Sequence, residues 1–199
     1  MPKGQLTKDH IIAQAAVLFN TKGYTGASLA DLMAVTGLKK GGIYNHFQNK
    51  EEILLEAFDY AVNVVNLALA KEVKSHYTAT DKLKGVVNFY RRYALKPVIQ
   101  GGCPILNSTV EADDAHPDLK TQVQKAYAVW VSSLSTIIER GIRRGEFRSE
   151  LAVEEVAIFF ISSIEGGIAM ARSFADDRYM EAVAGQLLRY IDQELSIMK

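Results

Sequence analysis

Apolar residues recur at helical spacing along nearly all of this 199-residue chain, and few windows show the strict alternation that is typical of strands. Near the N-terminus, for example, Ile11, Ala15 and Phe19 fall on one face of a helix. Only four prolines interrupt the pattern, at positions 2, 97, 104 and 117. These observations predict an all-α fold with about nine helices.

Capping residues and glycines divide the first fifty residues into three short helices. The first is expected to begin near Thr7 and to end at Gly23. The hydroxyl of Ser28 is placed to cap the second helix, which ends in a turn at Gly37. The third follows Leu38 and carries Ile43 and Phe47 into the core. This is the order of a helix-turn-helix.

Six further helices are expected after residue 48, several of them long. Asn49 is placed to cap the first of them, and Glu52 three residues later completes a capping-box pattern. The expected spans are about 50–74, 78–95, a short helix after 103, 117–144, 153–173 and 177–197. We therefore predict two domains, a head of residues 1–50 and a body of residues 51–199.

The net charge of zero hides an asymmetry between head and body. The head contains six basic and two acidic residues, a net charge of +4, and the body contains 17 basic and 21 acidic residues, a net charge of −4. A basic head on an acidic body indicates that the head meets a polyanion. Chance segregation of charge is the alternative explanation.

The stretch from Ser28 to Lys50 is the most informative in the chain. A helix that reads DNA must be short, protrude from the fold and have an outer face that is not bulky. The pair Gly41-Gly42 costs ~1 kcal/mol per glycine inside a helix, relative to alanine. That cost is reasonable where a backbone must come close to a DNA groove, so the stretch predicts a recognition helix.

Polar groups are concentrated in and around this helix. Within two turns lie cationic and hydrogen-bonding groups, and Lys50 stands at the start of the next helix, where the dipole favours phosphate. Tyr44 can instead belong to the core, and His46 can fill space or cap a helix. The candidate DNA-binding residues are Thr25, Ser28, Lys39, Lys40, Gly41, Gly42, Tyr44, Asn45, His46 and Lys50.

Over about residues 8–55 the chain resembles the TetR (tetracycline repressor-like) family of bacterial transcriptional regulators. The matching positions are Gly23, Tyr24, Ser28, Gly37, Lys40, Gly41, Tyr44, His46, Phe47, Lys50 and Glu51. Three positions depart from the family pattern. Ala27 replaces a threonine, which removes one phosphate contact. Lys39 and Gly42 replace small hydroxyl residues on the reading face, so the preferred bases are expected to differ.

The resemblance implies a ligand-responsive repressor that binds a palindromic double-stranded DNA operator as a homodimer. It also implies that the body receives a small-molecule effector, and the aromatic content of the body suggests an apolar or aromatic one. Taken singly, each of these side chains is more often ordinary core, and only as a set do they suggest a cavity. The candidate ligand-binding residues are Phe58, Val62, Phe89, Tyr93, Asn107, Glu111, Tyr127, Trp130, Phe159 and Ser163.

The last two expected helices carry more apolar residues than one small body needs to bury. Gly166 and Gly167 permit close approach of another helix. We expect these helices to pair with a second copy of the chain. The candidate interface residues are Ile161, Ile164, Ile168, Leu187, Leu188 and Ile191.

Cys103 is the only cysteine, so the chain cannot form an internal disulfide, and a reducing cytoplasm is the simplest location. Because Pro104 suits a first helical turn, Cys103 is the expected N-cap, where the helix dipole favours the thiolate. A buried structural thiol is the competing interpretation. The alternative functions are therefore a thiol- or electrophile-sensing repressor acting through Cys103, or a helical interaction protein without DNA binding.

Enzymatic activity is not expected, because no nucleophile–base pairing, phosphate loop or metal-ligand spacing stands out. We expect no cofactor and no metal ion. No uninterrupted apolar run reaches the ~18–20 residues of a membrane helix, so no membrane partner is expected.

Overall fold

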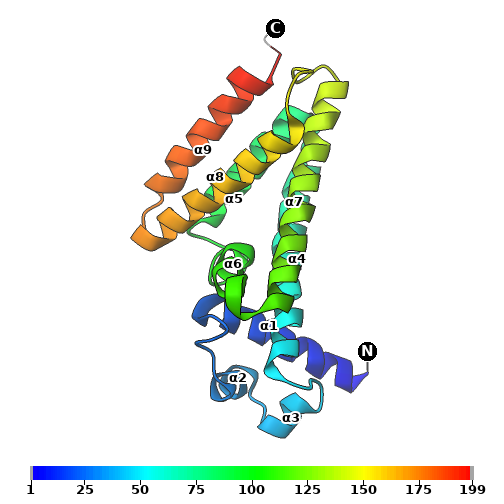
Figure 1. The fold of residues 1–199 in the computed structure, drawn as a ribbon, viewed down its shortest axis with the longest axis vertical. Coiled ribbons are helices and arrows are strands. Elements are labelled where there is room, and N and C mark those ends of the chain that lie inside the picture. The colour runs from blue at the N-terminus through cyan, green and yellow to red at the C-terminus, as the bar shows by residue number, and fades with distance from the viewer. Residues whose placement is uncertain (1, 198–199) are drawn as a thin grey trace. The chain divides into compact units, whose positions relative to one another are not determined.

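The structure, a computed structural model, describes residues 2–197. Within that range the regular elements are nine α-helices and one short π-helix, and no strand is present (Figure 1). An isolated antiparallel bridge between Phe147 and Ser196 is the only β-type pairing of the described residues. The prediction of an all-α fold is confirmed.

The helix boundaries agree with the expected spans to within a few residues, with two exceptions: α1 begins at Lys3 rather than near Thr7, and the last α-helix ends at Tyr190 rather than near residue 197. The chain continues from α9 into a π-helical turn that the sequence pattern did not predict. The elements are α1 Lys3–Lys22, α2 Leu29–Thr36, α3 Lys40–Tyr44, α4 Lys50–Lys74, α5 Ala79–Tyr93, α6 Pro104–Ala115, α7 Pro117–Arg143, α8 Val153–Phe174, α9 Arg178–Tyr190 and η1 Ile191–Leu195.

The described residues form two compact units. The first contains the chain up to Val65 together with Ile99–Lys125, and the second contains Asn66–Val98 together with the chain from Ala126 onward. The helices α4 and α7 each contribute to both units. The predicted domain boundary at residue 50 therefore differs from the division into compact units, and it stays a prediction.

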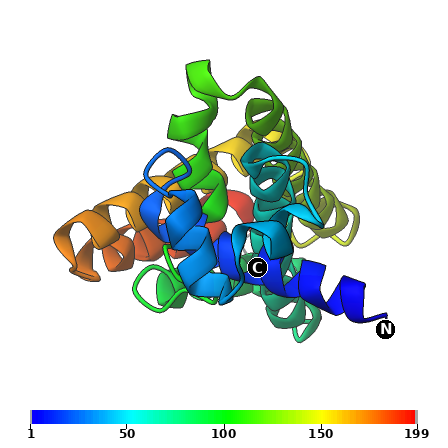
Figure 2. The same cartoon turned by 90° about the horizontal axis from the view of Figure 1, so that it is seen from below.

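In the first unit, α2 packs against α1 and α3 packs against α2 (Figure 2). The apolar face of α1 is fully buried, with Ile11 and Ala15 at 0% exposure. Ile43 and Phe47 are buried as predicted. A buried apolar side chain of this size contributes about 1.5–3 kcal/mol by leaving water, so this small core holds three short helices together.

In the second unit, α8 and α9 lie side by side, and α5 packs against both (Figure 1). Their shared core includes Val86, Phe160, Ile164 and Leu187. Backbone hydrogen bonds from Arg148 N to Leu195 O (3.0 Å) and from Ile197 N to Glu146 O (3.1 Å) hold the end of the described chain against the turn before α8.

By length and composition alone, α4 is the one described helix that is apolar enough to cross a membrane, with a mean hydropathy of 1.5 over its most apolar window. The same helix carries Glu56, whose carboxylate pairs with Lys8 at 2.8 Å. Its residues Ile53 and Phe58 are buried within the first unit. These contacts give α4 the role of a core helix.

Candidate nucleic-acid interface

The N-terminus of α2 is fixed by a complete capping box. Asp31 N–H donates to Ser28 Oγ at 3.1 Å, and Ser28 N–H donates to the Asp31 carboxylate at 2.7 Å. Lys22 lies 2.8 Å from the same carboxylate. The hydrogen bonds from Lys22 and Ser28 hold the pKa of Asp31 well below its usual range. The predicted cap at Ser28 is confirmed, and it leaves that residue exposed at the helix end.

The turn between α2 and α3 requires glycine. Gly37 has φ of +69° and ψ of +11°, and its N–H donates to Met33 O. This left-handed conformation is strained for other residues. His10 Nε2 lies 3.0 Å from Thr36 O and so connects α1 with the end of α2. The predicted helix, turn and helix are all present.

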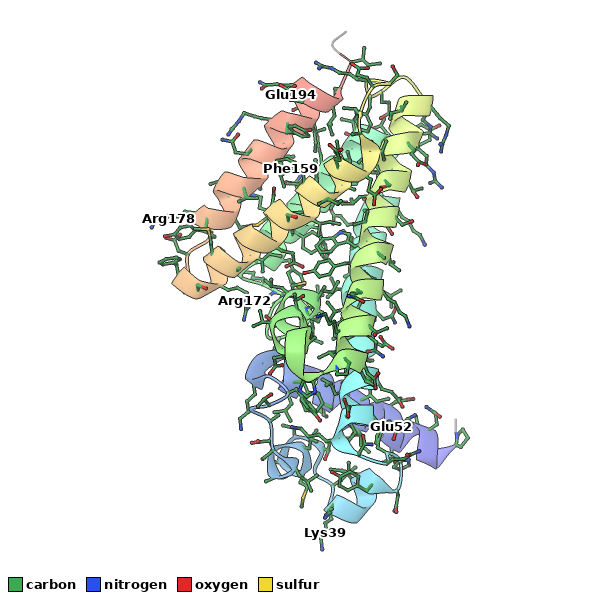
Figure 3. The ribbon with its side chains drawn as sticks, in the orientation of Figure 1. Lys39, Glu52, Phe159, Arg172, Arg178 and Glu194 are labelled. Carbon is green, nitrogen blue, oxygen red and sulfur yellow. The ribbon has the colours of Figure 1, made fainter. Side chains whose placement is uncertain are left out.

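Neither glycine of α3 is required by packing inside the protein. A Cβ atom at Gly41 would meet nothing within 4 Å, and one at Gly42 would make only ordinary contact with Leu38, at 3.6 Å. Both have φ outside the positive range. The space outside these residues is therefore open, as an approach to a nucleic acid would need. The Lys39 side chain points away from the ribbon (Figure 3).

Most candidate DNA-binding residues lie at the surface. Gly42, Tyr44, His46 and Lys50 are partly buried. The candidates that are exposed are Thr25, Ser28, Lys39, Lys40, Gly41 and Asn45. The first two lie at or just before the N-terminus of α2, and the other four lie on or beside α3.

Lys50 begins α4, as predicted, but its side chain is already engaged within the protein. Its Nζ donates to Tyr24 O at 2.6 Å and lies 4.0 Å from the centre of the Tyr24 ring. Burial lowers the pKa of Lys50, against the opposing charges of Glu111 and Asp31. Its proximity to a helix N-terminus suggested a phosphate contact, but the side chain folds back onto the loop after α1. We therefore assign it a structural role.

The cap of α4 also differs in detail. Glu52 N–H donates to Asn49 Oδ1 at 2.8 Å, as predicted. The Glu52 carboxylate, however, accepts from the N–H of Gln48 at 2.6 Å rather than from Asn49. It therefore satisfies a backbone donor one residue before the expected one.

Two candidate ligand contacts on α6 instead join that helix to the end of α1. The Glu111 carboxylate accepts from the N–H of Tyr24 at 2.9 Å and from that of Thr25 at 3.4 Å. Asn107 Nδ2 donates to Asn20 O at 3.0 Å and to Asn20 Oδ1 at 2.9 Å. Their spacing of four residues places both on one face of a helix, but the sequence did not indicate that this face contacts Asn20 and Tyr24.

The other candidate ligand residues do not come together in one site. Phe89 and Tyr93 line a hollow of about 430 Å³ in the second unit. Phe159 and Ser163 line a different groove of about 470 Å³ on α8 and α9. Phe58 and Glu111 line a hollow of about 20 Å³ in the first unit, which is too small for an organic molecule.

Trp130 is buried, at 7% exposure, with its ring centre 5.1 Å from that of Tyr90. Val62 and Tyr127 are partly buried. Trp130 is therefore packed against Tyr90 of α5 rather than open to a ligand. Helical spacing cannot distinguish a packed aromatic cluster from one that surrounds a cavity.

The expected dimer interface needs correction. Five of the six candidates, Ile161, Ile164, Ile168, Leu187 and Ile191, have exposures of 5% or less within a single chain, and Leu188 is partly buried. They form the contact among α5, α8 and α9. These apolar residues face the core of their own chain, so they leave little surface for contact with a second copy.

Cys103 is the residue before α6, as predicted, but its side chain is only 3% exposed. The structure therefore favours the structural interpretation of this thiol over a solvent-reachable one. Gly101 and Gly102 beside it have φ of +102° and +92°. A Cβ at Gly101 would collide with Asn20 O, so the loop is built to lie directly against the end of α1.

Comparison with known proteins agrees with this geometry. Residues 11–57 match the model of bacterial regulatory proteins of the tetR family, and residues 79–187 match the tetracyclin repressor-like C-terminal domain. The repressor DhaR of Mycobacterium sp. (strain GP1) is 26% identical over 166 residues, which cover 81% of this chain and 80% of DhaR.

Two solved structures have the same fold. A TetR transcriptional regulator from Chloroflexus aurantiacus J-10-FL superposes with a TM-score of 0.96 at 39% identity and full coverage of both chains. A cysteine variant of the TetR family regulator CifR, in complex with 26 bp of operator DNA, has a TM-score of 0.82 at 18% identity, over 91% of this chain and 94% of that one. The chain belongs to the TetR family of bacterial transcriptional regulators.

Proposed function

We propose that this chain is a ligand-responsive repressor that binds a palindromic operator as a homodimer. The observation that carries the proposal is the outer face of α3. Lys39, Lys40 and Asn45 are exposed there beside Gly41, whose outward side is empty. A short helix with a small, polar and cationic outer face fits the major groove of DNA.

The N-terminus of α2 supplies a second set of contacts. Ser28 and Thr25 are exposed beside the N-terminus of α2, where the helix dipole favours phosphate. These contacts, together with Lys40, set the position of the protein on DNA, and the side chains of Lys39 and Asn45 select the bases. DhaR, whose name describes a repressor, and the CifR complex with operator DNA support repression through operator binding.

A groove on α8 and α9 is the surface we assign to the homodimer. It includes Phe159 and Met170, which are 47% and 46% exposed, together with Gly166, Ala182 and Val183. Phe159 lies on α8 (Figure 3). Apolar and small residues on two neighbouring helices allow the same helices of a second copy to approach closely. Two heads related by a two-fold axis require matching half-sites, hence a palindrome.

The effector is expected in the second unit, because that unit contains a hollow of about 430 Å³ lined partly by Phe89 and Tyr93. A ligand that prefers the DNA-free state would release the operator by the difference between its affinities for the two states. The protein would act in the cytoplasm, where its DNA lies. The burial of Cys103 gives no support to direct thiol sensing.

A gel-shift assay with the DNA upstream of the chain's own gene tests the proposal. The expected result is one retarded species that contains two chains per duplex and resists competition by unrelated DNA. Equal binding to the upstream region and to unrelated DNA would contradict sequence-specific repression, and no binding to either DNA would favour a helical interaction protein.

A further inference from the structure

The second unit contains a hollow of about 430 Å³ whose lining differs from the rest of the body. One wall is the C-terminal part of α4, the other is α5, and residues 96–98 close one side. Its lining residues are Ala68, Lys71, Glu72, Ser75, Phe89, Arg92, Tyr93, Lys96 and Val98.

Three of these lining residues are cations and one is an anion. The anion, Glu72, is already engaged, because Arg92 Nη2 lies 2.8 Å from its carboxylate. Lys71 and Lys96 are exposed, and neither forms an ion pair with any side chain that the structure describes. Both charges border the hollow, and a bound anion would be attracted to them. The surplus is notable in a body whose net charge is −4.

The base of the hollow is apolar. Phe89 and Tyr93 are 7% and 2% exposed, and their ring centres lie 5.8 Å apart in a stacked arrangement. Ala68 and Val98 complete the apolar part of the lining. An apolar base with a cationic rim fits a molecule that has both a negative group and an apolar or aromatic body.

We propose that this hollow binds a small organic anion, with the negative group held by Lys71 and Lys96 and the apolar body placed against Phe89 and Tyr93. The inference rests on the proposed function, because it names the chemical class of the effector. Every ligand of this class would carry one negative group, such as a carboxylate, on an apolar or aromatic body.

The chain itself links this hollow to the DNA-binding helices. Val98 in the lining is followed by Ile99 and then by Gln100 and Gly102. The carbonyl groups of Gln100 and Gly102 accept hydrogen bonds from Asn20 Nδ2 of α1, at 2.7 and 2.9 Å. A ligand that fixes Lys96 and Val98 therefore acts on a segment that is hydrogen-bonded to α1 only a few residues later.

The test uses the full-length protein and a matched pair of fluorescent probes. The anionic probe is 8-anilinonaphthalene-1-sulfonate, and the neutral probe is N-phenyl-1-naphthylamine, which lacks the sulfonate. The double variant Lys71→Gln/Lys96→Gln is expected to weaken binding of the anionic probe about tenfold, and to leave binding of the neutral probe within about twofold. Trp130, the only tryptophan, gives a second readout through energy transfer to the bound probe.

Lys74→Gln is the matched control, because Lys74 is an exposed lysine on the same helix outside the lining. Equal loss of anionic-probe binding in this control and in the double variant would overturn the assignment of the hollow. Binding of the anionic probe that is unchanged in the double variant would also overturn it, as would no saturable binding to the native protein.

Operator affinity is then measured with and without the anionic probe. The probe is expected to weaken operator binding by the native protein and not by the double variant, which should bind the operator normally without probe. Probe binding that depends on the lysines but leaves operator affinity unchanged would overturn the assignment of the hollow as the effector site. If no variant bound any operator, the proposed function would fail, whereas the probe titrations would still decide whether the hollow binds anions.

Discussion

The ammonium group of Lys50 is bound to Tyr24, with Nζ 2.6 Å from the Tyr24 carbonyl oxygen and 4.0 Å from the ring centre. A single side chain thereby joins the start of α4 to the loop that follows α1. The same loop is bound from α6 by Glu111. The orientation of the DNA-binding helices within the first unit thus depends on contacts with residues outside the helix-turn-helix.

Replacing Lys50 by methionine should destabilise the protein by about 1 kcal/mol, because the Tyr24 carbonyl loses its charged donor while the apolar stem is kept. Urea unfolding measures the effect. Lys40→Met is the matched control, since Lys40 is exposed on α3 and its loss should leave stability unchanged. A Lys50 variant as stable as the native protein but weak in DNA binding would restore the phosphate-contact interpretation.

The same Lys40→Met variant should weaken binding to every DNA sequence alike. Removing one phosphate contact is expected to reduce the slope of log affinity against log salt by about one. Asn45→Ala should instead change the preferred base at one position, by about 1–3 kcal/mol of discrimination. A salt series on operator and scrambled duplexes measures both effects. A base-specific effect of Lys40, or a uniform effect of Asn45, would reverse the two assignments.

Stability should fall in acid partly through Asp31. Lys22 and Ser28 lower the pKa of this carboxyl in the folded state, so the unfolded chain binds its proton at a higher pH. Stability is therefore fully present above about pH 4 and is lost as the pH falls toward the lower folded-state pKa. Asp31→Asn should reduce this slope, and added salt should reduce it in the native protein because the group is exposed. Urea unfolding between pH 5 and pH 2 would show no difference between variant and native protein if the cap were unimportant.

Removing the Glu111 carboxylate should loosen the loop after α1. In Glu111→Ala the N–H groups of Tyr24 and Thr25 lose their acceptor, and we expect their hydrogen exchange to accelerate by about tenfold. Val110→Ala is the control, because Val110 is the neighbouring residue and 81% exposed. Unchanged exchange at Tyr24 in the Glu111 variant would show that the contact does not hold this loop.

A charge in the groove on α8 and α9 should produce monomers. Met170→Glu places an unpaired carboxylate within the assigned interface, and burial of such a charge is strongly unfavourable. Sedimentation velocity measures the oligomeric state. Leu67→Glu, at a position on α4 that is 64% exposed, should leave the dimer intact. A dimeric Met170 variant, or a monomeric Leu67 variant, would place the interface elsewhere.

The local features of the fold were predictable because their causes are local. The helical period of Ile11, Ala15 and Phe19, the cap at Ser28 and the turn at Gly37 each depend on residues within one or two turns of sequence. Lys50 and Glu111 were assigned differently because their partners lie 26 and 87 residues away. Periodicity shows that a side chain faces inward, and it does not show which group that side chain meets.

The body was less predictable for a related reason. The apolar stripe that includes Ile164 and Leu187 was assigned to a dimer, whereas it packs α8 and α9 against α5. Phe159, which was predicted to bind the ligand, instead lies exposed on α8 together with Met170. The basic rim of the hollow was missed because Lys71, Arg92 and Lys96 come from two helices and a following segment, and each alone resembles an ordinary solvated residue.

Gly41 gives the most direct measurement of the central claim, that the outer face of α3 binds DNA closely. Gly41→Ala adds one methyl group where the protein has nothing within 4 Å, so stability should be unchanged or raised by up to about 1 kcal/mol. Fluorescence anisotropy with an operator duplex should nevertheless show at least tenfold weaker binding, because the methyl group occupies space that the groove needs. A stable Gly41→Ala variant that binds the operator with native affinity would contradict the account.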